Sequence, residues 1–193
     1  MALPTLTAVA QWASIAMPTL YAGITFQYSL TMHHLARTSP TPKLLARQWL
    51  ALYQQGPRWV PPLINTAVLS NLFLAFYAVQ TASQKYLHLL AAALSFSILP
   101  MTFVYFEPGI NGACKWKAGL LLSREDGFEM AEGGMNNRIG VSVGRHSANE
   151  GARRWAEGVE MEALVVAWAG RNHGRWVLGV VAGVVSFWAS RGG

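Results

Sequence analysis

The first 106 residues of this chain contain no acidic residue, and this feature constrains the fold more than any other. All nine Asp and Glu residues lie between Glu107 and Glu162. The cations before Glu107 are few, and they stand at the ends of apolar runs: Arg37, Lys43, Arg47, Arg58 and Lys85. A water-soluble domain rarely leaves so much of its length uncharged, because charged residues usually cover its surface. Charge is costly inside a bilayer, so the pattern predicts an integral membrane protein.

Composition supports the same class of protein. Charged residues make up 12% of the chain and hydrophobic ones 52%, and soluble domains carry about 25% charged residues. A length of 193 residues predicts one domain, 1–193. The net charge of +6 does not indicate a nucleic-acid partner, because the cations flank apolar runs instead of forming a stripe. Cys114 is the only cysteine, which excludes a disulfide framework and a cysteine-based zinc site.

Four apolar stretches are long enough to cross a bilayer, which takes roughly 20 helical residues. They cover residues 6–35, 62–80, 86–106 and 168–190. We therefore predict an all-α fold, an integral membrane four-helix bundle with a long polar loop, 108–160, before the last helix. The glycine-rich part of that loop, 133–149, has no helical period, so we expect the loop to be partly disordered.

The distribution of Lys and Arg predicts an orientation for this multi-pass protein. The first and third loops hold most of the cations, which places them in the cytoplasm and both termini on the opposite side. Membrane lipid is then the expected surrounding, and an endomembrane the expected location. A homo-oligomer is compatible with the sequence.

Proline and glycine mark expected irregularities in the helices. Pro100 predicts a kink in the third stretch, and Glu107–Pro108–Gly109 predicts its end. Gly56–Pro57 predicts the end of a short helix in the first loop. Gly179 and Gly183 have the spacing of small residues at a close helix–helix contact in membranes.

Two helical faces carry candidate binding residues. Trp168, Asn172 and Arg175 stand at i, i+4 and i+7 and share one face. A cation and an amide at the mouth of an apolar helix are costly unless something uses them, although Arg175 could also reach back to the membrane interface. Trp49 and Tyr53 share a face of the short helix, which could equally be an amphipathic helix lying in the interface.

His33 and His34 close the first stretch and are candidate proton acceptors. The simpler interpretation is that they are interfacial, because a positive charge is favoured at a helix C-terminus. No two histidines stand at i and i+4, so we expect no metal site. Established catalytic motifs, such as a phosphate loop or a nucleophile elbow, are absent from the sequence.

Further residues extend these faces into an ordered set along the chain: Gln48, Trp49, Tyr53, Gly56, Pro61, Leu99, Pro100, Thr102, Pro108, Asn111, Trp168, Asn172 and Arg175. In this order and spacing they resemble the fungal anthrone oxygenase family, small membrane proteins with four helices from polyketide gene clusters. The resemblance covers most of the chain outside 133–149.

The resemblance implies a monooxygenase that oxidises a polyketide anthrone to an anthraquinone with molecular oxygen, without metal or flavin. A base, an apolar slot and donors to the enolate oxygen would suffice. His33 or His34 would take the proton, and Asn172 and Arg175 would hold the enolate oxygen. The flat hydrophobic substrate would contact aromatic and amide side chains at Trp49, Tyr53, Asn111 and Trp168.

Two other classes of function remain open on the sequence. One is a non-catalytic membrane protein that binds a hydrophobic metabolite, and the other is a scaffold for a biosynthetic complex. Oxygen consumption in the presence of an anthrone distinguishes the enzyme from both.

Overall fold

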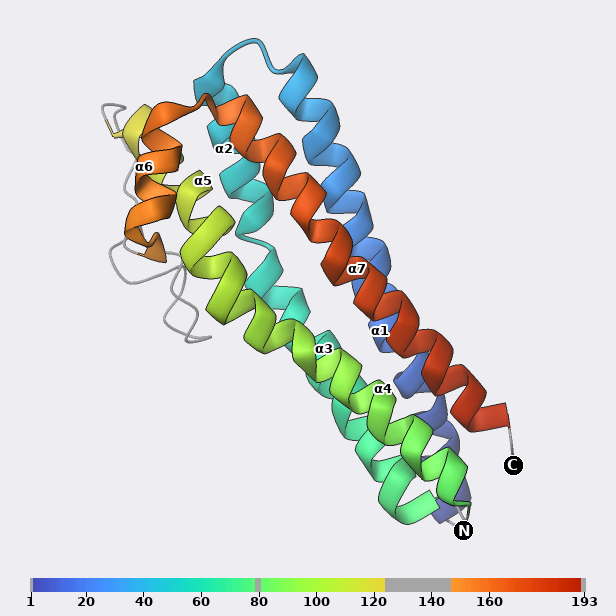
Figure 1. Ribbon diagram of the computed structural model, residues 1–193. Coiled ribbons are helices and arrows are strands. Elements are labelled where there is room, and N and C mark those ends of the chain that lie inside the picture. The colour runs from blue at the N-terminus through green and yellow to red at the C-terminus, as the bar shows by residue number, and fades with distance from the viewer. Residues whose placement is uncertain (1, 79–80, 124–146, 192–193) are drawn as a thin grey trace. The chain divides into compact units, whose positions relative to one another are not determined.

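Figure 1 presents a computed structural model that describes residues 2–78, 81–123 and 147–191, and no strand occurs among them. The helices, in chain order, are α1 (Ala2–Thr38), α2 (Pro42–Tyr53), α3 (Gly56–Phe73), α4 (Ala82–Pro100), α5 (Gly112–Leu122), α6 (Glu150–Gly158) and α7 (Met161–Arg191). Two π-helical segments continue α3 and α4: η1 (Leu74–Ala78) and η2 (Met101–Asn111). The expected all-α class is confirmed for the described residues.

The chain divides into two compact units. Unit 1 comprises Met1–Phe26, Trp59–Pro100 and Gly174–Gly193, and unit 2 comprises Gln27–Arg58 and Met101–His173. Both α1 and α7 therefore contribute residues to each unit. Each unit has its own hydrophobic core and is described by itself.

Unit 1 is held together by contacts among segments of α1, α3, α4 and α7. Tyr21, Ile64 and Ile98 form its fully buried core. A Cβ added to Gly179 would lie 2.9 Å from the carbonyl oxygen of Pro18, so glycine is needed for this close approach of α7 to α1. The packing role expected for the Gly179 and Gly183 spacing is therefore confirmed.

A buried hydrogen-bond network joins α3, α4 and α7 within unit 1. Asn71 Nδ2 donates to the Ala67 carbonyl oxygen over 3.0 Å, which fixes the orientation of the amide because a carbonyl can only accept. Asn71 Oδ1 therefore accepts from His88 Nδ1 at 2.8 Å and from the Ser186 hydroxyl at 3.2 Å. The neutral His88 ring then has its lone pair on Nε2, a buried atom without a hydrogen-bond partner among the described residues.

Unit 2 contains α2, η2, α5, α6 and the first part of α7. The side chain of Thr41 caps the N-terminus of α2 by accepting from Leu44 N, and Asn149 caps α6 by accepting from Ala152 N. Helix α5 contacts α2 and α6 (Figure 1). Their contact faces join the start of α7 in one core, which includes Trp49, Ile110, Cys114, Leu164 and Trp168.

The third expected helix ends at Gly109, within the predicted stop Glu107–Pro108–Gly109, so that prediction is confirmed. Gly109 has φ −93° and ψ −107°, which are not helical values, so two helices meet there across a kink. Helix α5 then begins at Gly112. Proline lacks the N–H for an ordinary α-helical bond, so Pro108 also favours a break at this position. Pro100 likewise stands where α4 passes into η2.

Two other boundaries differ from those expected. The stretch 108–160, expected as a polar loop, contains α5 and α6. Residues 124–146 lie outside the described residues, and so does most of the segment 133–149 for which we expected disorder. Helix α2 ends at Tyr53, and Gly56 begins α3 instead of ending the short helix.

Among the described residues, two helical stretches are long and apolar enough to cross a membrane, Pro42–Ala78 and Ala82–Leu122. The expected spans 62–80 and 86–106 fall within them, apart from residues 79–80. Helices α1 and α7 do not reach the same hydropathy. Polar residues recur along α1, and the apolar part of α7 is bounded by Arg175 and Arg191.

Candidate functional site

A buried ion pair lies at the centre of unit 2. Lys115 Nζ donates to Glu107 Oε1; the Lys115 side chain is fully buried, whereas 12% of the Glu107 side chain is exposed. The two residues stand on either side of the backbone irregularity at Gly109. Burying opposite charges as a bonded pair leaves no net charge in the core, but loss of either partner would strand the other.

The second oxygen of this carboxylate accepts two further hydrogen bonds. Tyr53 Oη on α2 donates to Glu107 Oε2 over 2.7 Å, and Asn111 Nδ2 donates to the same atom over 3.0 Å. Asn111 Oδ1 in turn accepts from Trp168 Nε1 on α7 at 2.9 Å. Four helical segments, α2, η2, α5 and α7, are thus joined by one buried polar network. We call it the Glu107 network, and its members are Tyr53, Glu107, Asn111, Lys115 and Trp168.

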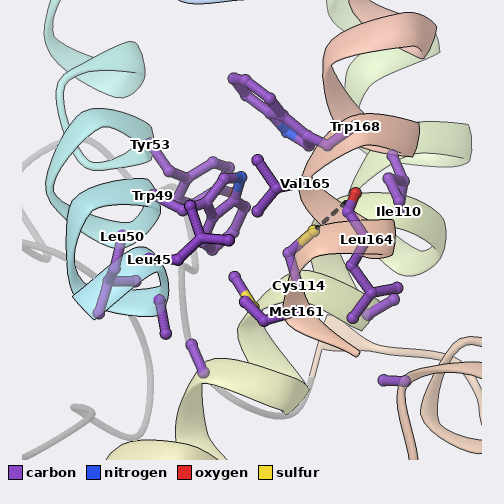
Figure 2. Packing of buried hydrophobic residues seen from close by; sticks show 14 of the residues in the cluster. Leu45, Trp49, Leu50, Tyr53, Ile110, Cys114, Met161, Leu164, Val165 and Trp168 are labelled. Atoms are coloured by element: carbon purple, nitrogen blue, oxygen red, sulfur yellow. Dashed lines mark hydrogen bonds between the residues drawn. The ribbon is translucent and has the colours of Figure 1, made fainter. Parts of the chain in front are cut away.

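Two members of the Glu107 network are aromatic, and Figure 2 shows their rings, those of Tyr53 and Trp168, together with the ring of Trp49. The rings of Trp49 and Tyr53 stack with centroids 4.9 Å apart and planes 14° apart. The Trp168 ring meets Trp49 nearly at a right angle, with 6.1 Å between centroids. Lys115 Nζ lies 5.6 Å from the centroid of the Tyr53 ring, an arrangement that places a cation over an aromatic face.

Four of the residues predicted to bind substrate lie together here. Trp49, Tyr53, Asn111 and Trp168 come from α2, η2 and α7, and all are buried. Asn172 lies one turn after Trp168 and is also buried in unit 2. Sequence spacing alone could not bring these segments together, but it did identify the helical faces that meet.

The predicted catalytic residues are more dispersed. His33 is half-buried and His34 is exposed on the part of α1 that belongs to unit 2. Arg175 belongs to unit 1, where its Nε donates to Tyr21 Oη over 3.1 Å. Only 9% of Arg175 is exposed, so the alternative of an arginine reaching out to the interface does not describe its position.

Glu107 and Lys115 were not among the predicted site residues. Glu107 was predicted only as part of a helix stop, and Lys115 lies in the stretch 108–160 that was expected to be a polar loop. Glu107 and Lys115 are separated by the kink at Gly109, so no helical spacing in the sequence indicates that they pair. Among the described residues, no three His, Cys, Asp or Glu side chains are grouped so that they could hold a metal ion.

Comparison with known proteins identifies one family. The family model described as anthrone oxygenase matches residues 49–185, which is more than half of the chain. No curated protein and no solved structure matches this chain. The whole Glu107 network lies within the matched range, whereas His33 and His34 lie outside it.

Proposed function

This chain belongs to the anthrone oxygenase family, and from that membership and the Glu107 network we propose that it oxidises a polyketide anthrone to an anthraquinone. The ring methylene becomes a carbonyl, so one anthrone and one O₂ give one anthraquinone and one water. An oxygenase role in polyketide metabolism is what the family suggests, and the specific reaction is our proposal.

The observation that carries the proposal is a buried carboxylate beside stacked aromatic rings, wholly within residues 49–185. A flat tricyclic substrate needs aromatic surface, for which Trp49, Tyr53 and Trp168 are the candidates. An acidic methylene needs a base held in an apolar setting, and the buried carboxylate of unit 2 is the candidate for it.

We assign the proton-accepting role to Glu107. Its side chain retains an exposed edge, whereas its partner Lys115 has none. Tyr53, Asn111 and Lys115 fix the carboxylate in place, so it need not reorganise when it acts. The first proton taken leaves a delocalised carbanion, which reacts with O₂ to give a carbon-bound peroxide. That peroxide accepts the proton, and loss of the second methylene hydrogen together with hydroxide leaves the carbonyl and water.

Three earlier assignments remain predictions. His33 or His34 is the alternative base, and it would act from the N-terminal helix. Asn172 is the candidate donor to the enolate oxygen in unit 2. Arg175 is a second candidate donor to the enolate oxygen.

We propose that the reaction needs no metal or flavin, because an anthrone carbanion can pass an electron to O₂ by itself. Treatment of membranes with EDTA, followed by gel filtration of the solubilised protein, should leave the rate of anthrone oxidation unchanged. A rate that falls and returns on adding a divalent metal would contradict this proposal.

The two apolar stretches Pro42–Ala78 and Ala82–Leu122 support membrane association. We propose a multi-pass arrangement in an endomembrane, where a flat hydrophobic anthrone would also partition. Such a substrate would reach the protein from the bilayer without crossing water.

The decisive experiment measures oxygen uptake and anthraquinone formation with emodin anthrone in membranes containing the protein. Glu107→Gln alone would strand the buried Lys115 ammonium, at about 3–5 kcal/mol. The test variant therefore combines Glu107→Gln with Lys115→Met. Loss of a general base typically lowers the rate about 10²–10⁴-fold.

The matched control removes an exposed ion pair from the same unit. Glu150 and Arg154 form such a pair on α6, with side chains 81% and 72% exposed. Glu150→Gln combined with Arg154→Met should retain full activity. If the Glu107/Lys115 variant also retains it at equal protein level, Glu107 is not the base, and His33→Gln and His34→Gln become the variants to examine.

Absence of turnover by the wild-type protein would instead favour the two non-catalytic classes. A metabolite-binding protein would still retain an anthraquinone in equilibrium binding, whereas a scaffold would not. The two measurements together therefore separate all three functions.

A further inference from the structure

One donor near the Glu107 network has no hydrogen-bond partner among the described residues. Trp49 is fully buried, and its Nε1 has no acceptor. Trp168 differs, because its Nε1 donates to Asn111. A buried donor without an acceptor costs about 1–3 kcal/mol. A buried donor without an acceptor in a native protein calls for an explanation, and one explanation is that the donor binds a ligand.

The position of this N–H group is fixed by its neighbours. The Trp49 ring stacks on Tyr53, whose hydroxyl is bonded to Glu107. Trp168 packs against the same ring, and Val165 of α7 projects toward it (Figure 2). The donor therefore cannot turn to find another acceptor, and it is held rigid before any reaction begins.

The side chains around Trp49 limit the kind of molecule that could accept a hydrogen bond from its Nε1. The side chains clustered with Trp49 are mostly apolar and buried, which favours a small apolar guest beside its N–H group. Dioxygen is small and apolar, so it enters such cores readily. When dioxygen gains an electron it becomes an anion, and a rigid N–H donor in an apolar core then stabilises it strongly.

We propose that Trp49 Nε1 marks the dioxygen site, where its N–H group donates to the oxygen anion formed during the reaction. This inference rests on the proposed function. The substrate carbanion gives one electron to O₂, which leaves a substrate radical and superoxide, and superoxide accepts the Trp49 N–H bond. Coupling of the pair forms the carbon–oxygen bond, and the resulting peroxide takes the proton held by the base.

Two substitutions test the role in catalysis. Trp49→Phe keeps an aromatic ring over Tyr53 but removes the N–H group. Removal of one donor of this kind lowers kcat by about 10²–10³-fold, and we expect a loss of this order. Trp116→Phe is the control: it removes an indole N–H from the same unit that donates to Glu157 at the exposed surface. It should leave turnover unchanged.

A second measurement does not depend on anthrone turnover. In protein labelled with ¹⁵N-tryptophan and solubilised in detergent, dissolved O₂ is paramagnetic and relaxes the indole protons that it approaches. The Trp49 signal, assigned by its disappearance in Trp49→Phe, should be relaxed more strongly by O₂ than the signal of Trp168, which is slightly more exposed. Xenon, an apolar surrogate for O₂, should shift the same signal.

The outcomes separate this inference from the proposed function. Wild-type turnover with a fully active Trp49→Phe variant overturns the dioxygen site and leaves the enzyme assignment intact. A Trp49 signal that is insensitive to O₂ and lies far upfield also overturns it, because the N–H would then point at the Trp168 ring. Selective O₂ contact without any wild-type turnover retains the site and rejects the anthrone reaction.

Discussion

At the scale of single residues, the buried polar groups matter most, both for stability and for the proposed reaction. Arg175, Asn71 and the Glu107 network are all removed from solvent, yet each has a defined hydrogen-bond partner. Because such groups are costly to bury, their partners decide whether they serve structure or reaction. Paired substitutions can separate the two roles.

For Arg175, the comparison is with its partner Tyr21. We expect Arg175→Ala to abolish anthrone turnover in membranes at unchanged protein level. Tyr21→Phe removes only the hydroxyl that accepts from Arg175 Nε, and it should leave turnover in place. An equal loss of turnover in both variants would mean that the bond supports unit 1 and that Arg175 does not act in the reaction.

Asn71 should matter for stability, because it serves both His88 and Ser186. Asn71→Leu leaves two buried polar groups without their acceptor, and each such group costs about 1–3 kcal/mol. Ser186→Ala removes one donor and leaves the bond between Asn71 and His88 intact, so its effect on thermal unfolding in detergent should be much smaller. Equal unfolding temperatures for the two variants would contradict the network.

At the scale of elements, the kink at Gly109 between α4 and α5 is decisive. Pro100 and Pro108 lack the N–H groups of a regular α-helix, and the chain is irregular from Met101 to Asn111. Glu107 lies before the kink and Lys115 after it, so their ion pair joins the two helices that meet there.

The contact between α1 and α7 gives a test of close helix packing. A Cβ at Gly179 would meet backbone, the Pro18 carbonyl oxygen at 2.9 Å, so the helices must separate. Gly179→Ala should therefore lower the unfolding temperature in detergent. Gly174→Ala on the same helix has open space, and it should be neutral or stabilising by about 0.5–1 kcal/mol. The reverse order of the two unfolding temperatures would show that this contact is not tight.

At the scale of the whole molecule, the proposed entry of the substrate from the bilayer depends on the protein residing in a membrane. Two stretches of the described chain are long and apolar enough to span, and many large apolar side chains are exposed, among them Leu69, Val104 and Trp188. Such surface is unusual for a soluble monomer and is suited to lipid.

The expressed protein should therefore sediment with membranes, resist extraction at alkaline pH and dissolve only in detergent. A monodisperse protein in detergent-free buffer would reject both the membrane assignment and the proposed route of substrate entry. This measurement needs no substrate, so it is independent of the oxidation assay.

The sequence by itself determined the helical class and the helical faces that carry Trp49, Tyr53, Trp168 and Asn172, because composition and local periodicity are written in consecutive residues. It also indicated the family, through the resemblance of its ordered motifs, and the family model over residues 49–185 confirms this. Only the tertiary structure decided that Glu107 and Lys115 pair in the core, because the kink at Gly109 sets how the helix before it and the helix after it face each other. It also decided that the Trp168 N–H group is hydrogen-bonded and that the Trp49 N–H group has no acceptor among the described residues. Hydrogen bonds between distant segments have no periodicity in the sequence.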